Sequence, residues 1–512
     1  GIAYEYLPIT PGNMTDKNVA DFKKLLKNAT RPALAFCRTG TRSTTLWARA
    51  SKGDLAADTI INAAAEAGYD LSAMKSDLTV ETPKTKGTAT QAEASSNHLE
   101  KSVRSHQIVI IGAGSAGIAT AASLLKRKPG LDIAIIEPNE EHFYQPGWTM
   151  VGGGVFKPEK TKRKMKELMP KQVKWIKSSV STFEPDSNTV TLSDGTKVAY
   201  DTLVVAPGIQ LDFDKIEGLT GTLGQNGVTS NYRYDLAPYT WELVQSLKQG
   251  RAIFTQPPMP IKCAGAPQKA MYLSCDHWLS NGVLKDIDVD FCNAGGVLFG
   301  VKEYVPALMN YVEKYNANLH FFHNLVKVDG PNKTAYFQQI GPDASAELIE
   351  KKFDILHVAP PQSAPDFIKV SPLVDDNGWV DVDQATLQHK QFPDIYSLGD
   401  VMNAPNAKTA AAARMQAPVV AGNVLHDMGY NVKRTMYNGY GSCPLTVEKG
   451  KIVLAEFGYG GTMLPTFPTW LLDSTKPSRL AWLLKEKVLP PIYWQGMLKG
   501  KEWLIKPTEI SE

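Results

Sequence analysis

A glycine-rich turn between a strand and a helix constrains the fold of this chain most. Residues 107–111, Gln-Ile-Val-Ile-Ile, predict a buried strand, the run Gly112-Ala-Gly-Ser-Ala-Gly117 follows, and residues 118–125 have helical spacing. Residues 132–137 predict a second strand that ends in an acid, Glu137, 20 residues after the last glycine of the run. A strand, a GxGxxG turn, a helix and a second strand ending in an acid predict a dinucleotide-binding βαβ unit.

The residue types of this turn fit contact with a pyrophosphate. Gly112 allows the tight turn, Gly114 lets the backbone approach the phosphates, and Gly117 lets the helix pack closely on the strand. The helix N-terminus then faces the negative charge, and Glu137 accepts hydrogen bonds from ribose hydroxyls. The predicted cofactor contacts of this unit are Gly112, Gly114, Ser115, Ala116, Gly117, Glu137 and Pro138. A glycine-rich turn in an unrelated α/β domain is the alternative.

Two further motifs favour FAD over NAD, which share this turn. Residues 394–400, Asp-Ile-Tyr-Ser-Leu-Gly-Asp, resemble the second FAD motif of the pyridine nucleotide-disulfide reductase superfamily, where the acid after the glycine holds the ribityl chain. Residues 204–208, Val-Val-Ala-Pro-Gly, resemble the segment that links the FAD domain to the second nucleotide domain. This resemblance implies bound FAD. It adds Ala206, Gly208, Gly399, Asp400 and Lys408 to the predicted cofactor contacts.

Length and composition narrow the class of protein. A chain of 512 residues exceeds what one hydrophobic core usually organises, so roughly two to four domains are expected. The net charge of +3 is too small for a nucleic-acid footprint. Five cysteines, far apart and odd in number, do not indicate a secreted disulfide framework. No stretch approaches the roughly 18 consecutive apolar residues of a spanning helix, and we expect no metal site.

Motif order and composition predict an α/β chain with two Rossmann-like dinucleotide-binding domains, one for FAD and one NAD(P)-like. A small α/β domain precedes them and a helical, membrane-facing region follows. The predicted limits are a partial front domain at 1–75, a polar linker at 76–104, an FAD domain in two parts at 105–220 and 386–430, a second dinucleotide-like domain at 221–385, and a C-terminal region at 431–512.

From about residue 106 onward the chain resembles the mitochondrial-type branch of the sulfide:quinone oxidoreductases. The segments that carry the resemblance are His142-Phe-Tyr-Gln-Pro-Gly-Trp-Thr-Met-Val-Gly-Gly-Gly154, Pro260-Ile-Lys-Cys-Ala-Gly-Ala-Pro-Gln-Lys269, Gly378-Trp-Val-Asp-Val-Asp383, Lys408-Thr-Ala-Ala-Ala412 and Ser442-Cys-Pro-Leu445. The resemblance implies capture of sulfide at a disulfide beside the flavin, transfer of electrons through FAD to a quinone, and departure of sulfane sulfur on an acceptor. It assigns Cys263 as one of the two redox cysteines.

The second redox cysteine is expected directly after the Gly-Asp of the second FAD motif, and Val401 occupies that position. This substitution argues against a disulfide between positions 263 and 401 and against sulfide as the substrate. Cys263 alone could act as a persulfide carrier or a nucleophile toward the flavin, because nearby lysines favour its thiolate. A chemically silent, buried Cys263 is the alternative. The other cysteines of this part, Cys275, Cys292 and Cys443, are predicted to be mainly structural.

The front domain carries a possible second reactive thiol. In Phe36-Cys37-Arg-Thr-Gly-Thr-Arg42-Ser43 a cysteine ends a strand and is followed by a loop and a helix, which is how a protein stabilises a thiolate. The segment resembles both the rhodanese loop and a tyrosine-phosphatase-like family found fused to such flavoproteins. The short spacing from Cys37 to Arg42, and Phe36 in place of the usual His, favour sulfur transfer. In the alternative, Arg42 and Ser43 merely cap a helix.

The C-terminal region mixes aromatic, aliphatic and lysine side chains over residues 470–499, which suits a helix lying in a bilayer interface. A core-packing or dimer-forming helix pair is the alternative. The predicted partners are therefore a quinone, sulfide or another small sulfur compound, and a membrane surface, with a possible homodimer and no nucleic acid. We expect a peripheral protein on an inner membrane surface.

Two other functions compete with sulfide oxidation. An NAD(P)H:quinone reductase should carry a second glycine fingerprint in the middle of the chain, but residues 293–297 offer only Asn-Ala-Gly-Gly-Val. A flavin-bound assembly subunit without sulfide chemistry is the other rival, and Val401 is its best support.

Overall fold

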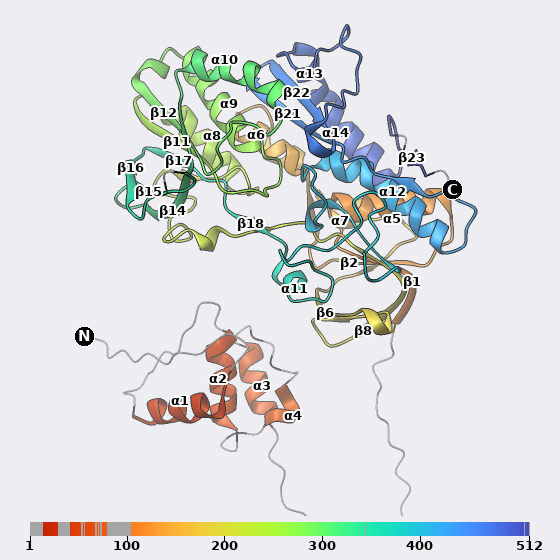
Figure 1. Ribbon diagram of the computed structural model, residues 1–512. Helices are drawn as coiled ribbons and strands as arrows, with labels where there is room; N and C mark the ends of the chain where they lie inside the picture. Colours follow the sequence, from red (N-terminus) through yellow and green to blue (C-terminus); the bar gives the residue numbers. More distant parts are fainter. Residues whose placement is uncertain are drawn as a thin grey trace, which may run out of the picture. The chain divides into compact units, whose positions relative to one another are not determined.

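The structure is a computed structural model, and the chain divides into two compact units, residues 1–99 and 100–512 (Figure 1). The residues that it describes are 14–28, 41–52, 55, 57–66, 69, 71, 74–78, 104–342, 344–505 and 507–510.

The described part of the first unit is helical. Its helices are α1 (Asp16–Asn28), α2 (Thr41–Ser51), α3 (Ala57–Glu66) and α4 (Lys75–Leu78). A small core forms between α2 and α3, where Ala48 and Ile60 are fully buried. The helix predicted after the Cys37 loop is confirmed as α2. The strand predicted to end at Cys37, and Cys37 itself, lie outside the described residues.

The second unit contains a mainly parallel sheet that confirms the predicted βαβ unit. Its strands, in spatial order, are β5 (Lys174–Ile176), β2 (Ile133–Ile136), β1 (Arg104–Ile111), β8 (Lys197–Val205), β7 (Thr189–Leu192) and β6 (Val180–Glu184), with β19 (Ile395–Ser397) paired to the end of β8. The register places Ile111 beside both Ile136 and Val205. The turns after β1, β2, β8 and β19 therefore meet at one edge, where parallel sheets bind ligands.

Two helices pack against each other beside this sheet, α5 (Ser115–Arg127) and α12 (Ala410–Asp427) (Figure 1). α12 begins at Thr409, whose side chain accepts a hydrogen bond from the Ala412 N–H and caps the helix. Small side chains such as Ala119, Ala121 and Ala421 are buried there. They allow the two helices to approach closely, and their N-termini both point to the ligand edge of the sheet.

A second parallel sheet follows in the predicted second dinucleotide-like domain. Its strands, in order, are β10 (Val228–Thr229), β17 (Ile355–His357), β11 (Gly250–Gln256), β12 (Ile287–Asn293) and β13 (Asn318–Phe321). Helices α8 (Ala237–Ser246), α9 (Ala266–Ser280) and α10 (Val305–Tyr315) lie beside it in Figure 1. An antiparallel sheet of β14 (His323–Asp329), β15 (Thr334–Gln339) and β16 (Leu348–Lys352) completes this part.

The remaining short strands and α-helices of this unit lie outside the main sheets. They include β3 (Glu141–Phe143), α6 (Trp148–Gly152), β4 (Lys162–Lys164), α7 (Met165–Leu168), β9 (Gln210–Leu211), β18 (Gln362–Ser363), α11 (Asp366–Lys369), β20 (Thr435–Met436) and β23 (Thr508–Glu509).

The C-terminal region adds a hairpin and a long helical stretch. The hairpin consists of β21 (Gly441–Glu448) and β22 (Lys451–Phe457), and β21 contacts α9. The helical stretch is continuous from residue 479 to 499. It consists of α13 (Arg479–Leu483), a wide turn (Leu484–Val488), α14 (Leu489–Pro491), a second wide turn (Ile492–Gly496) and a tight turn (Met497–Lys499). Within the described residues, no helix is long and apolar enough to span a bilayer.

Candidate active site

The glycine turn has the geometry that its residue types predict. Gly112 has φ +95°, and a Cβ there would lie 2.6 Å from the Ala206 carbonyl oxygen. A Cβ on Gly117 would lie 1.9 Å from the Gly112 carbonyl oxygen, so no larger residue fits without moving the backbone. A Cβ on Gly114 meets nothing within 4 Å. Open space therefore lies at the N-terminus of α5, where a phosphate group would bind.

Glu137 ties the end of β2 to this turn. Its Oε2 accepts a 2.9 Å hydrogen bond from the Ala113 N–H, and its Oε1 accepts one of 2.8 Å from the Asn139 N–H. A carboxylate has about four acceptor positions, so capacity remains for ribose hydroxyls. Glu137 is nearly buried, whereas Pro138 is exposed at the mouth of the turn.

The second FAD motif lies against the first. Gly399 has φ +81°, and a Cβ there would come within 3.2 Å of Ala116 at the start of α5. Its N–H donates a 2.9 Å hydrogen bond to Gln416 of α12. The next residue, Asp400, accepts no side-chain hydrogen bond from the described residues, although Lys408 and Lys262 attract its charge. Burial outweighs this attraction and raises the pKa of Asp400. Its carboxyl group is free to accept from a ribityl hydroxyl.

Lys408 holds the turn around Asp400. Its buried amino group donates 2.9 Å hydrogen bonds to the carbonyl oxygens of Asp400 and Met402 and lies 4.1 Å from the centre of the Trp379 ring. Burial lowers the pKa of Lys408 to about 8. The carbonyl of Lys408 accepts a 2.8 Å hydrogen bond from the Cys263 N–H, so the FAD motif and the cysteine loop are joined directly.

Cys263 lies in the loop between β11 and α9, at the edge of the second sheet that meets the first domain. Its backbone has φ +50°, which is unusual for a residue with a side chain. On its N-terminal side, the Lys262 amino group donates a 2.5 Å hydrogen bond to Gln145. Burial lowers the pKa of Lys262 to about 8 against the attraction of Asp400 and Cys263. The predicted redox cysteine and the predicted flavin contacts therefore form one site.

Cys443 on β21 is the second cysteine of this site. Its Sγ lies 3.3 Å from the Sγ of Cys263, although 180 residues separate the two in sequence. Gly265 makes the approach possible, because a Cβ at that position would lie 2.6 Å from the Cys443 Sγ. The S–S bond of a disulfide is about 2.04 Å long, so a small side-chain movement would join the two sulfur atoms.

The electrostatics of the pair are asymmetric. The hydrogen bond with Cys443, opposed by burial and assisted by Lys269, holds the pKa of Cys263 well below its ordinary value. The hydrogen bond with Cys263, together with burial, raises the pKa of Cys443. Lys269 of α9 is buried, with its amino group 3.1 Å from the Cys263 Sγ and 3.7 Å from the Cys443 Sγ. Both shifts favour the thiolate at Cys263 and the thiol at Cys443.

A second buried lysine connects the pair to the C-terminal helical stretch. Lys485 is 3% exposed, and its amino group donates a 2.9 Å hydrogen bond to the Pro146 carbonyl. Burial lowers its pKa to about 8 and the charge of Lys269 acts in the same direction, while the two cysteines oppose the shift. The region expected at the membrane thus contributes a cation to the neighbourhood of the sulfur atoms.

The structure places a cysteine that was predicted to be mainly structural at the candidate site. The Sγ of Cys443 lies 3.3 Å from that of Cys263, and a redox role for Cys443 is therefore taken up below as a proposal. Cys275 and Cys292 are fully buried in α9 and β12, and burial raises the pKa of Cys292 to about 12. Val401 is buried in the core beside the FAD motif. The sequence signal for Cys443 was present, because the string Ser442-Cys-Pro-Leu445 is among those that carry the family resemblance.

The structure also gives positions for other residues that the sequence analysis names. His142 accepts the Tyr493 O–H in a 2.6 Å hydrogen bond and donates to the Ala113 carbonyl at 3.1 Å, which links the glycine turn to the C-terminal stretch. Gly208 has φ +82° in the turn after β8. Arg42 is the second residue of α2, but its side chain lies outside the described part, as does all of Cys37. The front site therefore stays a prediction.

The residues at the edge of the first sheet fit FAD. The open N-terminus of α5, the spare acceptor capacity of Glu137 and the unpartnered Asp400 match pyrophosphate, ribose and ribityl groups in turn. A flavin held by these groups would lie near the sulfur pair, because Cys263 hydrogen-bonds to Lys408 and interacts with Asp400.

Comparison with known proteins agrees with this arrangement. Residues 106–254 match the family model described as pyridine nucleotide-disulphide oxidoreductase, and residues 1–54 match the phosphatase-like domain of beta-lactamase hydrolase-like proteins. The protein is therefore an FAD-dependent oxidoreductase of the pyridine nucleotide-disulphide class. The match at residues 1–54 confirms the phosphatase-like character that the sequence predicts for the front domain.

Two curated relatives define the family. The mitochondrial sulfide:quinone oxidoreductase of Dictyostelium discoideum is 43% identical over 406 residues, which cover 78% of this chain and 88% of the relative. That of Mus musculus is 38% identical over 395 residues, covering 77% and 87%. The solved sulfide:quinone oxidoreductase of Aquifex aeolicus shares the fold, with a TM-score of 0.62 at 19% identity, covering 77% of this chain and 92% of that one. This chain belongs to the sulfide:quinone oxidoreductase family.

Proposed function

We propose that the protein oxidises sulfide at the Cys263–Cys443 pair and passes two electrons through FAD to a quinone. The observation that carries this proposal is the 3.3 Å separation of the two sulfur atoms, beside Lys269 and joined through Lys408 to the predicted FAD contacts. The pair supplies the second thiol that Val401 does not provide, and thereby removes the main objection to sulfide as the substrate.

The asymmetry of the pair sets the direction of the first step. In the oxidised pair, hydrosulfide attacks the Cys443 sulfur, a new S–S bond forms there, and the bond between the two cysteines breaks. Cys263 departs as the thiolate, because the thiol of lower pKa is the better leaving group and Lys269 stabilises its charge. Cys443 is left as a persulfide, and no electron has yet left the protein.

A nucleophilic acceptor then removes the outer sulfur of the persulfide and leaves Cys443 as a thiolate. Re-forming the bond between the two cysteines releases two electrons. Bound FAD supplies a two-electron acceptor for the cysteines and a donor for a quinone. Lys269 and Lys485 keep the sulfur atoms in a cationic environment throughout, which favours the entry of the hydrosulfide anion.

The spacing of the pair also suits one bridging sulfur atom. Two consecutive S–S bonds of about 2.04 Å each, bent at the middle atom, span a distance close to that between the two cysteines. A resting state with one extra sulfur therefore needs little movement of β21 or of the loop that holds Cys263, since the sulfur atoms already stand 3.3 Å apart.

Attachment to a membrane surface through residues 470–504 is the second part of the proposal. The exposed apolar side chains of this region are Trp470, Leu471, Leu480, Leu483, Val488, Trp503 and Leu504. The opposite side of the helical stretch is anchored, with Trp482, Trp494 and Leu498 buried in the protein. Such a helix suits the interface of a bilayer, where a lipid quinone is available. The mitochondrial names of the two relatives favour an inner membrane surface.

The front domain is proposed to accept the sulfane sulfur that the cysteine pair releases. Cys37 and Arg42 would act as the acceptor thiol and its anion-binding partner. The match to a phosphatase-like family model concerns residues 1–54, and the short spacing between these two residues favours sulfur over phosphate. Equal rates of persulfide transfer to cyanide by the wild type and by Cys37→Ser would exclude this role.

An anaerobic mixing experiment tests the main proposal. Sulfide should bleach the flavin absorbance of the wild type, and Cys263→Ala should abolish the bleaching. Rapid bleaching by NADH but not by sulfide would instead support the NAD(P)H:quinone reductase. The loop after β11 argues against that rival, because residues 257–265 replace the glycine fingerprint with prolines and the redox cysteine.

A further inference from the structure

A strongly basic segment runs along the surface from Lys157 to Lys177. It contains nine Lys or Arg and two Glu, a surplus of seven positive charges. The whole chain has a net charge of only +3, so the rest of the protein is net negative. This concentration is a local feature that attracts anions to one place on the molecule.

Most of these cations face solvent. The ion pairs of the segment within the described residues join Lys162 to Glu141 and Lys177 to Glu140. The exposed cations without an ion pair in that part of the chain are Lys157, Lys160, Arg163, Lys164, Lys166, Lys171 and Lys174. Within the described residues these cations form no ion pair, so they are available to an anionic partner.

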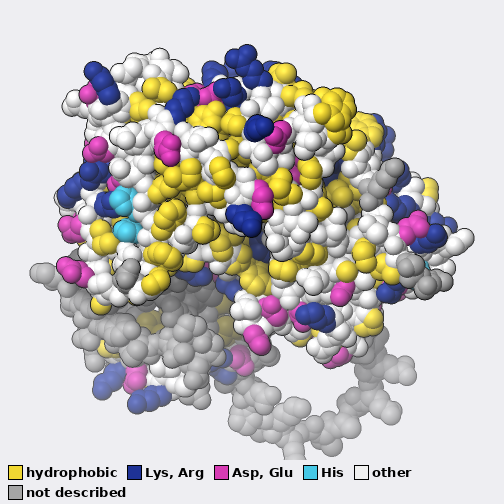
Figure 2. Space-filling view, turned by 45° about the horizontal axis from the view of Figure 1, so that its top comes forward, with side chains coloured by type: hydrophobic (Ala, Val, Ile, Leu, Met, Phe, Trp, Pro, Cys, Tyr) yellow, Lys and Arg dark blue, Asp and Glu magenta, His cyan; other side chains and the backbone are white. Residues whose placement is uncertain are grey.

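The basic segment runs beside the C-terminal helical stretch. In chain order, Lys160 attracts Glu486, Arg163 lies 5.1 Å from the centre of the Trp494 ring, and the Glu167 carbonyl accepts a 3.5 Å hydrogen bond from Lys499. The contacts occur in the same order along both segments, so the two lie side by side. Apolar groups for a bilayer and cations for its headgroups thus lie on adjoining elements. Figure 2 shows hydrophobic side chains gathered on the face that it presents, with Lys and Arg around them.

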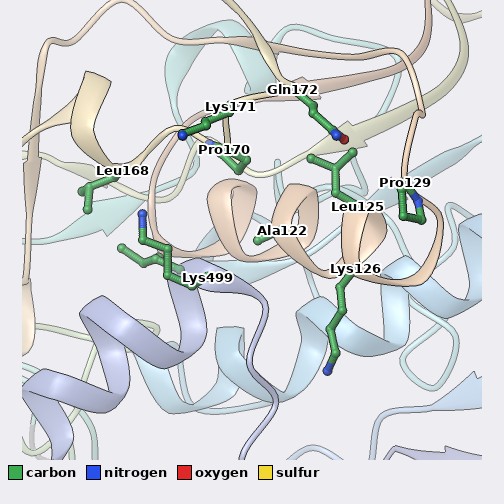
Figure 3. A pocket seen from close by; sticks show the side chains of 10 residues that line it. Ala122, Leu125, Lys126, Pro129, Leu168, Pro170, Lys171, Gln172 and Lys499 are labelled. Atoms are coloured by element: carbon green, nitrogen blue, oxygen red, sulfur yellow. The ribbon is translucent and has the colours of Figure 1, made fainter.

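A pocket of about 380 Å³ lies where these elements meet the C-terminal half of α5. Its walls include the apolar side chains of Ala122, Leu125, Leu168 and Leu498, and Lys171 and Lys499 line it as well (Figure 3). Lys126 also contributes to the lining, but Figure 3 shows its side chain pointing away from the pocket, and Glu502 lies 3.8 Å from its amino group.

The pocket therefore combines an apolar floor with two ammonium groups. The C-terminus of α5 carries partial negative charge, which disfavours an anion at the Pro129 end of the pocket and leaves the lysines as the position for it. This combination fits a molecule with one anionic group and an aliphatic part.

We propose that the pocket binds the phosphate and glycerol region of an anionic phospholipid, and that the segment 157–177 draws the protein to membranes rich in such lipids. This inference rests on the proposed membrane attachment, and adds a choice of lipid to it. The phosphate contacts Lys171 and Lys499, and the glycerol region lies against the apolar wall of the pocket. Exposed apolar side chains alone would give no preference between neutral and anionic membranes.

The test uses the full-length holoprotein and vesicles of two compositions, phosphatidylcholine alone and phosphatidylcholine with phosphatidylglycerol. Binding is measured by flotation. The wild type should prefer the anionic vesicles, and added salt should weaken that preference. Lys171→Gln/Lys499→Gln should reduce binding to anionic vesicles about 10- to 30-fold and leave binding to neutral vesicles unchanged. Lys171→Arg/Lys499→Arg should retain the preference.

The matched control is Lys248→Gln/Lys285→Gln, which removes two exposed lysines from the second dinucleotide-like domain and should bind like the wild type. Equal binding of the wild type to both vesicles would overturn the proposal, as would full anionic preference in the Lys171/Lys499 double variant. Sulfide-dependent reduction of a water-soluble quinone, measured on the same samples, reports the proposed chemistry separately. Loss of all vesicle binding would reject the membrane attachment itself.

Discussion

In the proposed mechanism, the contact between Cys263 and Cys443 makes the redox chemistry a property of two residues. Neither residue is distinctive alone: one is half-buried in a loop and the other is buried on a strand. Together with Lys269 they form a pair in which one sulfur is held as the thiolate. Cysteines that act as one redox unit should fail together when either is removed.

Replacement of Cys443 tests this dependence. Cys443→Ser should reduce sulfide-dependent quinone reduction on the order of 10³-fold or more, with FAD still bound, because no disulfide can form. The double variant Cys263→Ser/Cys443→Ser should be no slower than either single variant. Cys275→Ala, which changes a buried cysteine outside the pair, should keep most of the activity. The measurement is the steady-state rate of sulfide-dependent quinone reduction, together with the FAD content of each variant. Near-normal activity of Cys443→Ser would contradict the proposed pairing.

The charge of Lys269 should be visible in the reactivity of Cys263. In Lys269→Met the thiolate loses the ammonium group 3.1 Å away, so the pKa of Cys263 should rise. The pH profile of alkylation by iodoacetamide should shift to higher pH, whereas Lys269→Arg should stay near the wild type. Mass spectrometry of the Cys263 peptide gives the rate at each pH. An unshifted profile in Lys269→Met would exclude this electrostatic role.

At the scale of elements, the packing of α5 on β1 depends on Gly117, although this residue has no side chain with which to contact a cofactor. Gly117→Ala places a Cβ against the Gly112 carbonyl, so α5 must move away from the strand and its N-terminus leaves the phosphate position. The purified variant should contain less than about a tenth of the wild-type FAD. Gly300→Ala, whose Cβ meets nothing within 4 Å, is the control and should contain normal FAD. Visible absorbance relative to protein measures both.

His142 couples three elements, namely β3, the glycine turn and the C-terminal stretch. Burial lowers its pKa to about 4, below its ordinary value of 6.5. The unfolded chain therefore binds the proton more readily than the folded protein between these values. Stability contributed by the neutral imidazole is complete above pH 6.5 and is lost as the pH falls toward 4.

This linkage predicts an acid-sensitive holoprotein. Between pH 7 and pH 5 the His142 contribution should fall by about 2 kcal/mol. His142→Gln retains a donor and an acceptor, and should show a lower melting temperature at pH 7 but a smaller decrease on going to pH 5. Thermal unfolding at several pH values is the measurement. A steeper decrease in the variant than in the wild type would refute the assignment.

At the scale of the whole molecule, the C-terminal region supplies Cys443 and Lys485 to the proposed site and also carries exposed apolar side chains. Leu480→Ser/Leu483→Ser should lower binding to phosphatidylcholine vesicles by about 100-fold, because each change removes an exposed apolar side chain from the bilayer contact. Activity with a water-soluble quinone should persist. Leu279→Ser/Leu348→Ser removes two comparably exposed leucines elsewhere and should bind normally.

Much of this organisation could be predicted from the sequence. The glycine turn, Glu137 and Gly399-Asp400 can be recognised in the sequence, because local backbone geometry requires those residue types at fixed spacing. The cysteine pair could not be derived locally, since β21 reaches Cys263 only through packing of the C-terminal hairpin on α9. The burial of Lys485 could not be predicted either, because the sequence of a lysine-rich helix does not indicate which ammonium group points inward.

The proposed bond between Cys263 and Cys443 can be tested directly by mass spectrometry of the oxidised, full-length protein after non-reducing digestion. We predict one cross-linked species that joins the peptides of these two cysteines, either directly or through one additional sulfur, and that disappears on anaerobic treatment with sulfide and an acceptor thiol. Peptides that carry both cysteines as independently alkylated free thiols after oxidation, or a cross-link from Cys263 to another cysteine, would contradict it.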